Sequence, residues 1–430
     1  MEQVIIIGAG LAGATAALSL SKAGITPLIL EARERIGGRA YSRPFAGAKD
    51  DRRLEYGGSW ITPYHDRIRV HAADLGLTIR PRAAVKQRLA LRDGEVGHPR
   101  FDSPAEREAH ERALARVAMD AAFTKKGLAS DEQGRPLAGI TYKAYFDRLA
   151  PPAATRHMFD AWWTTSGNGA HDEIAATEFL SSCAYGGGLA ENMIDVWSDT
   201  VEPGMGVLAE RMIAASGATL KLSSPIASVT QSASAVSVIT AAGETLQAGH
   251  VLLALGINQL AAVQLSPTLP ALAAQAVARG HGGKAFKLWI RARGIPVGTV
   301  ITGDSSGIEL MFAERNDADG ATLIVCFGLQ LNDAAPEDPA WVKAQFSRLA
   351  PNAAFLGYDR HDWIRDPFAR GTWVAARADM MEAFEHAAWQ PQGRVAFASS
   401  DYAPEQAGWF EGAVRSGEAA AAWLIRQASH

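Results

Sequence analysis

A glycine-rich segment between two short apolar runs constrains the fold of this chain more than any other feature. Val4–Ile7 is a continuous apolar run, and Gly8–Gly13 follows it at once. The alanine-rich stretch 14–23 has the composition of a helix, and 26–30 is a second apolar run. A strand, a tight glycine turn, a helix and a second buried strand make up the βαβ unit that binds dinucleotides.

Each glycine of this segment has a physical task in such a unit. Gly8 allows the tight turn, Gly10 allows close approach to a diphosphate, and Gly13 allows the helix to pack on the strand. Glu31 follows Gly8 by 23 residues and is placed to accept hydrogen bonds from ribose hydroxyls. We therefore expect the whole turn to contact the cofactor: Gly8, Ala9, Gly10, Leu11, Ala12 and Gly13. The alternative is a glycine-rich turn in an unrelated α/β sheet, and the unit alone does not separate NAD from FAD.

Composition excludes several other classes of protein. The 430 residues carry a net charge of −4, which argues against nucleic acid or anionic lipid as the main partner. Cys183 and Cys326 lie far apart with no CxxC pair, and no histidine spacing is typical of a metal site, so no bound metal is expected. No apolar run reaches about 18 residues and no signal peptide is recognised. We expect a cytoplasmic protein with no membrane partner.

A second group of glycines and arginines follows Glu31. Ala32 and Arg33 come first, and Gly37, Gly38 and Arg39 follow. An arginine at this place can neutralise a diphosphate, and paired glycines let the backbone pass close to it. Farther along the chain comes the segment Glu55-Tyr56-Gly57-Gly58-Ser59-Trp60.

With these two segments the sequence resembles the flavin-containing amine oxidase family, which includes monoamine and polyamine oxidases and their bacterial, soluble relatives. In that family both segments line FAD, the second beside the flavin ring. The resemblance implies diphosphate or ribose contacts for Ala32, Arg33, Gly38 and Arg39. It implies contacts at the flavin edge for Gly57, Gly58, Ser59 and Trp60.

The resemblance extends to the C-terminus and implies further FAD contacts. They are expected from Ile226, Trp363, Ser400, Asp401, Trp409, Phe410 and Ala413. Three positions depart from the family pattern: Gly256 stands where proline is usual, Asp401 replaces the usual glutamate, and Ser399 replaces a common glycine. The glycines of all the motifs are expected along one cofactor: Gly8, Gly10, Gly13, Gly37, Gly38, Gly57, Gly58, Gly204, Gly206, Gly408 and Gly412.

The family also implies a catalytic lysine that holds a water beside flavin N5. Lys284 and Lys287 are the two candidates. Lys287 fits better because its spacing from Gly283 matches the family's Gly-x-x-x-Lys pattern and because an apolar strand follows it directly. Alternation along that strand puts Lys287 and Trp289 on one face and Phe286 on the other. Lys284 remains open as the alternative.

Two tryptophans are expected to cage the amine over the flavin. Trp409 lies in the last motif, and Trp373 follows Trp363 by ten residues, as in the family. An aromatic face attracts a cation by roughly 0.5–2 kcal/mol. Thr372 stands where enzymes with covalent flavin carry cysteine, so the resemblance implies non-covalent FAD. The alternative is that both tryptophans only fill the hydrophobic core and do not contact the substrate.

The expected fold is α/β, with a Rossmann-like FAD domain interleaved with a smaller α+β substrate domain. The FAD domain comprises 1–79, 196–285 and 390–430, and the substrate domain comprises 80–195 and 286–389. The expected activity is oxidation of a primary or secondary amine by hydride transfer to flavin N5, with O2 or another acceptor reoxidising the flavin. The alternatives are an L-amino-acid oxidase, a flavin desaturase and a flavin-binding interaction protein without turnover. A homodimer is possible from the sequence alone.

Overall fold

The computed structural model describes residues 2–47, 51–125, 130, 134–188, 193–331 and 333–428. Within these ranges the strands form two main sheets. The strands of the first sheet are β1 (Glu2–Ile7), β2 (Leu28–Leu30), β9 (Thr219–Lys221), β10 (Ile226–Gln231), β11 (Val236–Thr240), β12 (Thr245–Leu253), β13 (Gln264–Ser266) and β19 (Val395–Phe397). Their order is β13-β10-β11-β12-β1-β2-β9, with β19 beside β12.

β1 lies inside this sheet with a parallel neighbour on each edge. Ile5 pairs with Val251 of β12 on one side and with Leu28 of β2 on the other. Val4–Ile7 are all buried. This burial explains the uninterrupted apolar run, because a parallel strand is covered on both faces.

The helices of this half run between and after its strands. They are α1 (Leu11–Lys22), α2 (Asp66–Asp74), α8 (Met205–Ser216), α9 (Ile257–Leu260), α10 (Ala271–Arg279), α12 (Met381–Phe384) and α13 (Phe410–Ala428). α1 packs against α8 and α13. A Cβ at Gly417 of α13 would lie 2.3 Å from the carbonyl oxygen of Ala12, so small residues let these two helices approach closely.

α1 begins at Leu11, three residues before the predicted start at 14. The last part of the glycine segment therefore forms the first helical turn. The predicted start lies too far along the chain because glycine and alanine at the start of a helix give little hydrophobic periodicity. The consequence is that the free N–H groups of this turn lie directly after β1.

The second sheet carries the strands β6 (Gln87–Arg92), β7 (Glu95–Gly97), β14 (Ala285–Arg293), β15 (Thr299–Thr302), β16 (Ile308–Asn316), β17 (Thr322–Leu329) and β18 (Ala354–Arg360). Their order is β18-β14-β17-β16-β15-β6-β7. The accompanying helices are α3 (Pro104–Lys125), α4 (Tyr142–Leu149), α5 (Ala153–Gly167), α6 (Ala176–Tyr185), α7 (Met193–Val196) and α11 (Pro339–Leu349). α5 packs on β16 and β17, and α6 packs on α3.

Two small antiparallel pairs complete the strands of the described ranges. β3 (Ser42–Pro44) pairs with β4 (Arg53–Glu55), and β5 (Thr78–Pro81) pairs with β8 (Asp199–Glu202). Short 3₁₀ helices span Ala378–Met380, His386–Trp389 and Ser400–Tyr402.

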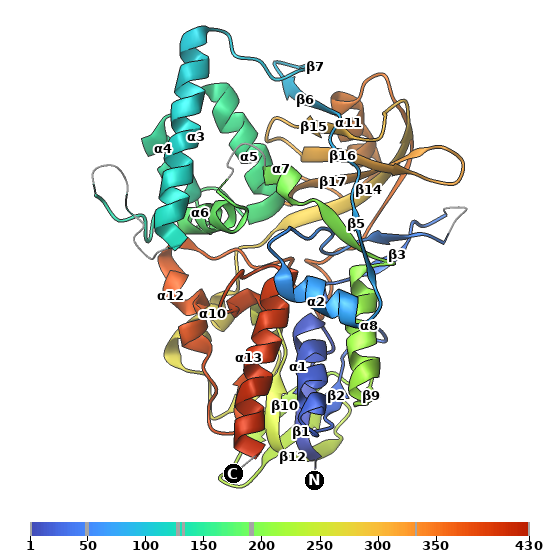
Figure 1. The fold of residues 1–430 in the computed structure, drawn as a ribbon, viewed down its shortest axis with the longest axis vertical. Coiled ribbons are helices and arrows are strands. Elements are labelled where there is room, and N and C mark those ends of the chain that lie inside the picture. The colour runs from blue at the N-terminus through green and yellow to red at the C-terminus, as the bar shows by residue number, and fades with distance from the viewer. Residues whose placement is uncertain are drawn as a thin grey trace.

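The two sheets lie in opposite halves of the molecule. In Figure 1 the first sheet, with α1, α8 and α13, fills the lower half, and both termini lie at the bottom. The second sheet and α3 to α6 fill the upper half (Figure 1). The mixed architecture confirms the predicted α/β class. The first sheet draws its strands from 2–30, 219–266 and 395–397, and the second from 87–97 and 285–360, while the predicted domain boundaries stay a prediction.

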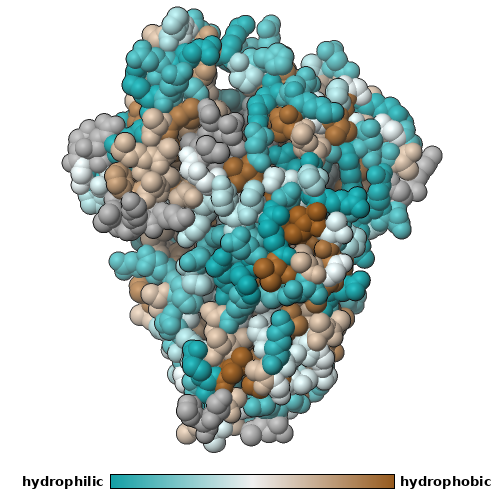
Figure 2. Space-filling model, viewed as in Figure 1, coloured by the Kyte–Doolittle hydropathy of each residue, from teal (hydrophilic) through white to brown (hydrophobic). Residues whose placement is uncertain are grey.

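The surface shown in Figure 2 is largely hydrophilic, and its hydrophobic residues form small separate groups. Among the described residues, no helix combines the length and the apolar composition that crossing a bilayer requires. In the same residues, no cluster of three or more histidine, cysteine or acidic side chains is arranged to hold a metal ion.

We expect Gly13→Ala to destabilise the protein. A Cβ at Gly13 would lie 2.0 Å from the carbonyl oxygen of Gly8 and 3.2 Å from the Cβ of Ala254, so α1 would have to move away from β1 and β12. Overpacking of this kind costs about 1–3 kcal/mol of unfolding free energy. Denaturant unfolding measures the loss. Gly97→Ala is the control, because Gly97 is exposed and its added Cβ would meet no atom within 4 Å; equal stability of the two variants would contradict the expectation.

Candidate active site

A cavity of about 390 Å³ lies at the carboxyl ends of the parallel strands of the first sheet. Gly8 follows β1, Glu31 follows β2, Ala254 follows β12 and Ser399 lies just after β19, and all four line it. Ligands of open α/β sheets bind at this edge, where the strands end. Lys287 of β14 supplies part of the opposite wall, so the cavity lies between the two sheets.

The glycine turn forms one end of the cavity. Gly8 has a φ of +106°, and a Cβ there would lie 2.5 Å from the carbonyl oxygen of Ala254. A Cβ at Gly10 would meet no protein atom within 4 Å, which leaves the space beside it free for a ligand. Leu11 and Ala12, in the first turn of α1, also line the cavity. Backbone N–H groups and the partial positive charge of a helix N-terminus are suited to a diphosphate.

Glu31 is held in place beside this turn by two backbone amides. The N–H of Ala9 donates to Oε2 at 2.8 Å, and the N–H of Arg33 donates to Oε1 at 2.9 Å. The side chain is buried except where it meets the cavity. A carboxylate has about four acceptor positions, so Glu31 can still accept hydrogen bonds from the hydroxyls of a ribose.

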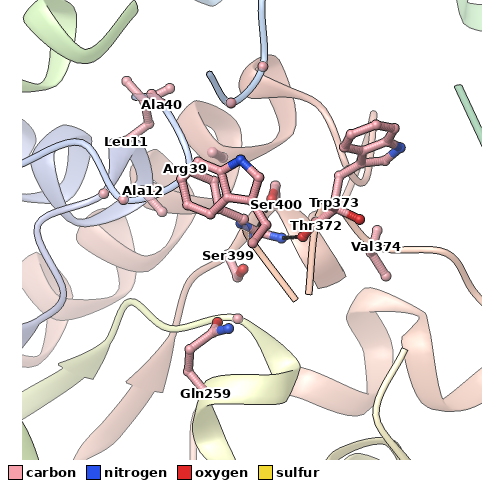
Figure 3. A pocket seen from close by; sticks show the side chains of 18 of the residues that line it. Leu11, Ala12, Arg39, Ala40, Gln259, Thr372, Trp373, Val374, Ser399 and Ser400 are labelled. Atoms are coloured by element: carbon pink, nitrogen blue, oxygen red, sulfur yellow. Dashed lines mark hydrogen bonds between the residues drawn. The ribbon is translucent and has the colours of Figure 1, made fainter. Parts of the chain in front are cut away.

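Both predicted diphosphate arginines are already paired with aspartates. Arg33 donates to Asp366 at 2.7 Å. Arg39 donates to Asp401 at 2.6 Å, to the hydroxyl of Ser400 at 3.0 Å and to the carbonyl oxygen of Thr372 at 2.8 Å. These bonds fix the guanidinium groups in the cavity wall. Figure 3 shows Arg39 beside Ser400 and Thr372, with Gln259 on the opposite wall.

Two of the departures from the family pattern, Gly256 and Asp401, lie in direct contact. The carboxylate of Asp401 accepts a hydrogen bond from the N–H of Ile257 at 3.0 Å. A Cβ at Gly256 would lie 2.6 Å from Oδ2 of Asp401 and 2.3 Å from Oε1 of Gln259. The glycine therefore gives this carboxylate the space that a larger residue would take.

The Gly57–Trp60 segment passes between the two halves with no room for side chains at its glycines. A Cβ at Gly57 would lie 1.7 Å from the carbonyl oxygen of Arg39, and one at Gly58 would lie 2.3 Å from the ring of Phe410. The carbonyl oxygen before Gly57 accepts a hydrogen bond from Nε1 of Trp363 at 2.8 Å. This segment is consequently held flat along the cavity wall.

Lys287 projects from β14 into the cavity and is 3% exposed. Its Nζ donates to the carbonyl oxygen of Gly57 at 2.7 Å and to the hydroxyl of Ser59. Burial lowers the pKa of Lys287 to about 8, while the nearby carboxylates of Glu55 and Glu314 act to raise it. The ammonium group of Lys287 therefore loses its proton more readily than that of an exposed lysine.

The predicted alternation along β14 is confirmed. Trp289 packs in the core cluster next to the cavity, whereas Phe286 and Leu288 pack in the cluster on the other face of the second sheet. Lys284 is exposed and does not line the cavity. Of the two candidate lysines, the fold brings only Lys287 to the cavity among the described residues.

Trp373 and Trp409 both line the cavity, and each is held by specific contacts. Nε1 of Trp373 donates to the carbonyl oxygen of Ser166 at 2.6 Å. The ring of Trp409 lies 5.6 Å from that of His65 and 6.2 Å from that of Trp197. Their side chains therefore have defined positions in an aromatic wall.

Asn168 connects this wall to the second sheet. It ends α5 in a left-handed conformation with φ +61° and is fully buried. Its side-chain amide donates to the carbonyl oxygen of Trp373, and its side-chain oxygen accepts from the hydroxyl of Thr372 and from the N–H of Ala285. One buried side chain thus holds the chain on both sides of Trp373.

Most of the residues predicted from the sequence line the one cavity. They are Gly8, Gly10, Leu11, Ala12, Glu31, Ala32, Arg33, Gly38, Arg39, Gly57, Gly58, Ser59, Trp60, Ile226, Lys287, Trp363, Trp373, Ser400, Trp409, Phe410 and Ala413. Ala9, Gly13 and Asp401 lie behind the wall and support it. Their individual roles toward a cofactor or a substrate stay predictions.

Sequence reasoning missed several residues of the wall. Glu178 of α6, Trp197 and Phe327 of β17 all line the cavity, and none of them lies in a recognisable motif. Trp163 of α5 also lines it; the sequence leaves open whether the segment 162–166 lines the pocket or packs beneath it. They become neighbours of the motif residues only through the packing of the helices on the second sheet.

Comparison with known proteins agrees with this geometry. The family described as flavin containing amine oxidoreductase matches residues 11–425. The chain is 30% identical to (S)-6-hydroxynicotine oxidase of Paenarthrobacter nicotinovorans, with 98% of each chain covered. It is 27% identical to pseudooxynicotine dehydrogenase of a Pseudomonas species, over 96% of this chain and 84% of the relative. The fold is similar to that of putrescine oxidase bound to putrescine, with a TM-score of 0.84, 23% identity and 99% of each chain covered.

We expect Asn168→Ala to destabilise the protein and to loosen Trp373. The substitution leaves a buried hydroxyl, a buried N–H and a buried carbonyl oxygen without their partner. Each unsatisfied group costs about 1–3 kcal/mol. Denaturant unfolding measures the loss, and tryptophan fluorescence quenching by acrylamide measures the exposure of indole rings. Asn352→Ala, at an exposed position, is the control; an Asn168 variant as stable as this control would contradict the role of the network.

Proposed function

The chain belongs to the flavin-containing amine oxidoreductase family, and we propose that it is an FAD-dependent oxidase of primary or secondary amines. One observation carries this proposal. The cavity that begins at the glycine turn continues to a buried lysine, Lys287, and to two tryptophans, Trp373 and Trp409. A dinucleotide cradle and an aromatic amine pocket are thereby joined in one space.

The cradle fits a flavin dinucleotide by its shape and its donor groups. The open space at Gly10, the N-terminal turn of α1 and the acceptor positions of Glu31 suit a diphosphate and a ribose. Gly57 and Gly58 are proposed to lie beside the flavin end, because both line the cavity and neither could carry a side chain without meeting Arg39 or Phe410. FAD is proposed to bind without a covalent bond, because Thr372 offers no thiol at the attachment position.

When bound, the flavin supplies the electron acceptor that takes a hydride from the carbon bearing the nitrogen, and O2 or another acceptor then removes the electrons. The chain supplies orientation and proton control. Lys287, held by Gly57 and Ser59, is proposed to hold a water at its Nζ on the substrate side of the cavity. The amine is released as an imine, which water hydrolyses to an aldehyde or a ketone.

The aromatic wall is proposed to select and orient the amine. Trp373 and Trp409 present large apolar faces, and desolvation there favours the neutral amine over the ammonium form. A cationic Lys287 acts in the same direction, because a positive neighbour disfavours a second positive charge. The neutral form is the one whose nitrogen lone pair can stabilise the positive charge left when the hydride departs.

The cations that line the cavity bear on the choice between amines and amino acids. The substrate carboxylate of an amino-acid oxidase requires a fixed cation near the reacting end. Among the described residues, Arg33 and Arg39 are paired with aspartates, whereas Lys287 and Arg370 line the cavity without an ion pair. An amino acid is therefore the alternative substrate class that the reduction experiment must test.

A cytoplasmic location and a homodimer stay predictions from the sequence.

We expect amines to bleach the visible absorption of the bound flavin in the absence of oxygen. The experiment adds mono-, di- and polyamines and, as separate samples, amino acids to the purified protein under anaerobic conditions. Reduction by an amine and recovery of the spectrum on admitting air support the proposal. Reduction by amino acids alone, or by no compound of the panel, would overturn it.

We expect Lys287→Met to slow flavin reduction or reoxidation by about 100-fold or more, as loss of a positioned proton-transfer group does. Stopped-flow absorbance separates the two half-reactions. Lys284→Met is the matched control, because it removes the same group from an exposed position on the same segment. If both variants react at the wild-type rate, the role assigned to Lys287 is wrong.

A further inference from the structure

One irregular segment of the chain, residues 366–374, follows the cavity from the end at Glu31 to the aromatic wall. We call it the strap. It contains no helix or strand. At its start Asp366 is paired with Arg33, and near its end Nε1 of Trp373 donates to the carbonyl oxygen of Ser166 at 2.6 Å. Most of the strap lines the cavity: Pro367, Phe368, Arg370, Thr372, Trp373 and Val374, the last three of which are labelled in Figure 3.

The strap is held in place by side chains from other parts of the chain. Arg33 donates to Oδ1 of Asp366 at 2.7 Å, and Nε2 of His361 lies 2.8 Å from Oδ2. The side-chain amide of Asn258 donates to the carbonyl oxygen of Arg370 at 2.8 Å. Further side-chain hydrogen bonds reach the strap from Gln259, Arg39 and Asn168. Because the strap belongs to no sheet or helix, its local opening is controlled by these bonds.

The backbone conformation at Arg370 depends on such an anchor. Arg370 has a φ of +52°, in the left-handed region that residues other than glycine rarely adopt. A residue stays in this region only where the surrounding structure holds it there. Asn258 supplies that support: its amide holds the carbonyl oxygen of Arg370, and its own side-chain oxygen accepts from the N–H of His281 at 3.1 Å. Without Asn258, the middle of the strap would lose its fixed position.

The first part of the strap borders the end of the cavity to which the proposed function assigns the adenosine of FAD. The ring of Phe368 lies 5.6 Å from the guanidinium carbon of Arg33 and lines the cavity. The N–H of Ser224 donates to the carbonyl oxygen of Glu31 at 2.8 Å, and this bond brings Ile226 to the same end. Phe368 and Ile226 therefore offer apolar surface to a flat ring such as adenine.

We propose that the strap closes on the adenosine end of bound FAD and thereby couples retention of the cofactor to the position of Trp373. This inference rests on the proposed binding of FAD. Release of FAD then requires the anchor at Asp366 to open. By linkage, bound FAD stabilises the closed strap by the same free energy with which the closed strap retains FAD. Because Trp373 belongs to the strap, the cofactor also stabilises this part of the substrate wall.

The first test measures the release of FAD from the purified holoenzyme as a rise in flavin fluorescence after dilution. Asp366→Asn removes the charge that faces Arg33 and His361, so FAD should leave about 10- to 100-fold faster, as loss of a hydrogen bond between charged groups implies. Asp366→Glu keeps the charge and should release FAD more slowly than Asp366→Asn. Asp172→Asn, at an exposed position, is the control and should match the wild-type rate.

Asn258→Ala tests the strap without altering a residue proposed to bind FAD, because Asn258 does not line the cavity. This variant should also release FAD faster than the wild-type protein. In holoenzyme labelled with 5-fluorotryptophan, the ¹⁹F signal of Trp373, identified by its loss in Trp373→Phe, should shift or broaden in Asn258→Ala. The signal of Trp341 in α11, which does not line the cavity, should stay unchanged.

The two variants separate the strap from a direct contact of Arg33 with the cofactor. Faster release in Asp366→Asn alone would assign the effect to Arg33 and overturn the coupling. An unchanged Trp373 signal in Asn258→Ala would overturn it as well. If Asp366→Asn does not fold, Asn258→Ala decides the question by itself. A wild-type protein that binds no FAD would overturn the proposed function, whereas bound FAD that both variants release at the wild-type rate would overturn this inference alone.

Discussion

The parallel pairing of β1 on both of its edges is the constraint on which the site depends. Two parallel strands that are neighbours in a sheet cannot be joined by a tight turn. The chain therefore forms α1 between β1 and β2, and the other neighbour of β1 is β12, which comes much later in the sequence. The carboxyl ends of these strands then meet at one edge of the sheet. Gly8, Glu31 and Ala254 are brought together there, although they are far apart in the sequence.

The parts of the site that obey local rules could be predicted from the sequence. A buried strand, a glycine turn and a helix follow one another within the first 22 residues. The acidic residue that such a unit places beside the ribose, Glu31, comes directly after the next strand. Alternation along a single strand placed Lys287 and Trp289 on one face, because side chains on a strand point to opposite faces in turn. The preference for Lys287 over Lys284 came from the family's spacing and from the apolar strand that follows Lys287. Trp373 and Trp409 came from the family resemblance, Trp409 by its motif and Trp373 by its distance from Trp363, and both line the cavity.

The parts that depend on packing between distant segments could not be predicted. Gly204 and Gly206 were expected along the cofactor, but they do not line the cavity, and a Cβ at either would approach Ser42 or Ala40 instead. A glycine motif indicates that something passes close to the backbone, and in this case it is another segment of the same chain. Glu178 shows the opposite case, because it lies in no motif and only the packing of α6 brings it to the cavity.

The charges around the cavity differ in how firmly the fold fixes them. At the glycine turn, the N-terminus of α1 and the arginines favour an anion, and the arginines are kept in place by Asp366 and Asp401. On the helical wall, Glu178 has no ion-pair partner among the described residues, and burial raises the pKa of its carboxyl group to about 7. Its negative charge is therefore only partly present at neutral pH, whereas the ion-paired arginines keep their charge there. The part of the cavity whose charge is set by the fold is consequently the part suited to a diphosphate, because ion pairs hold it in one geometry before any ligand binds.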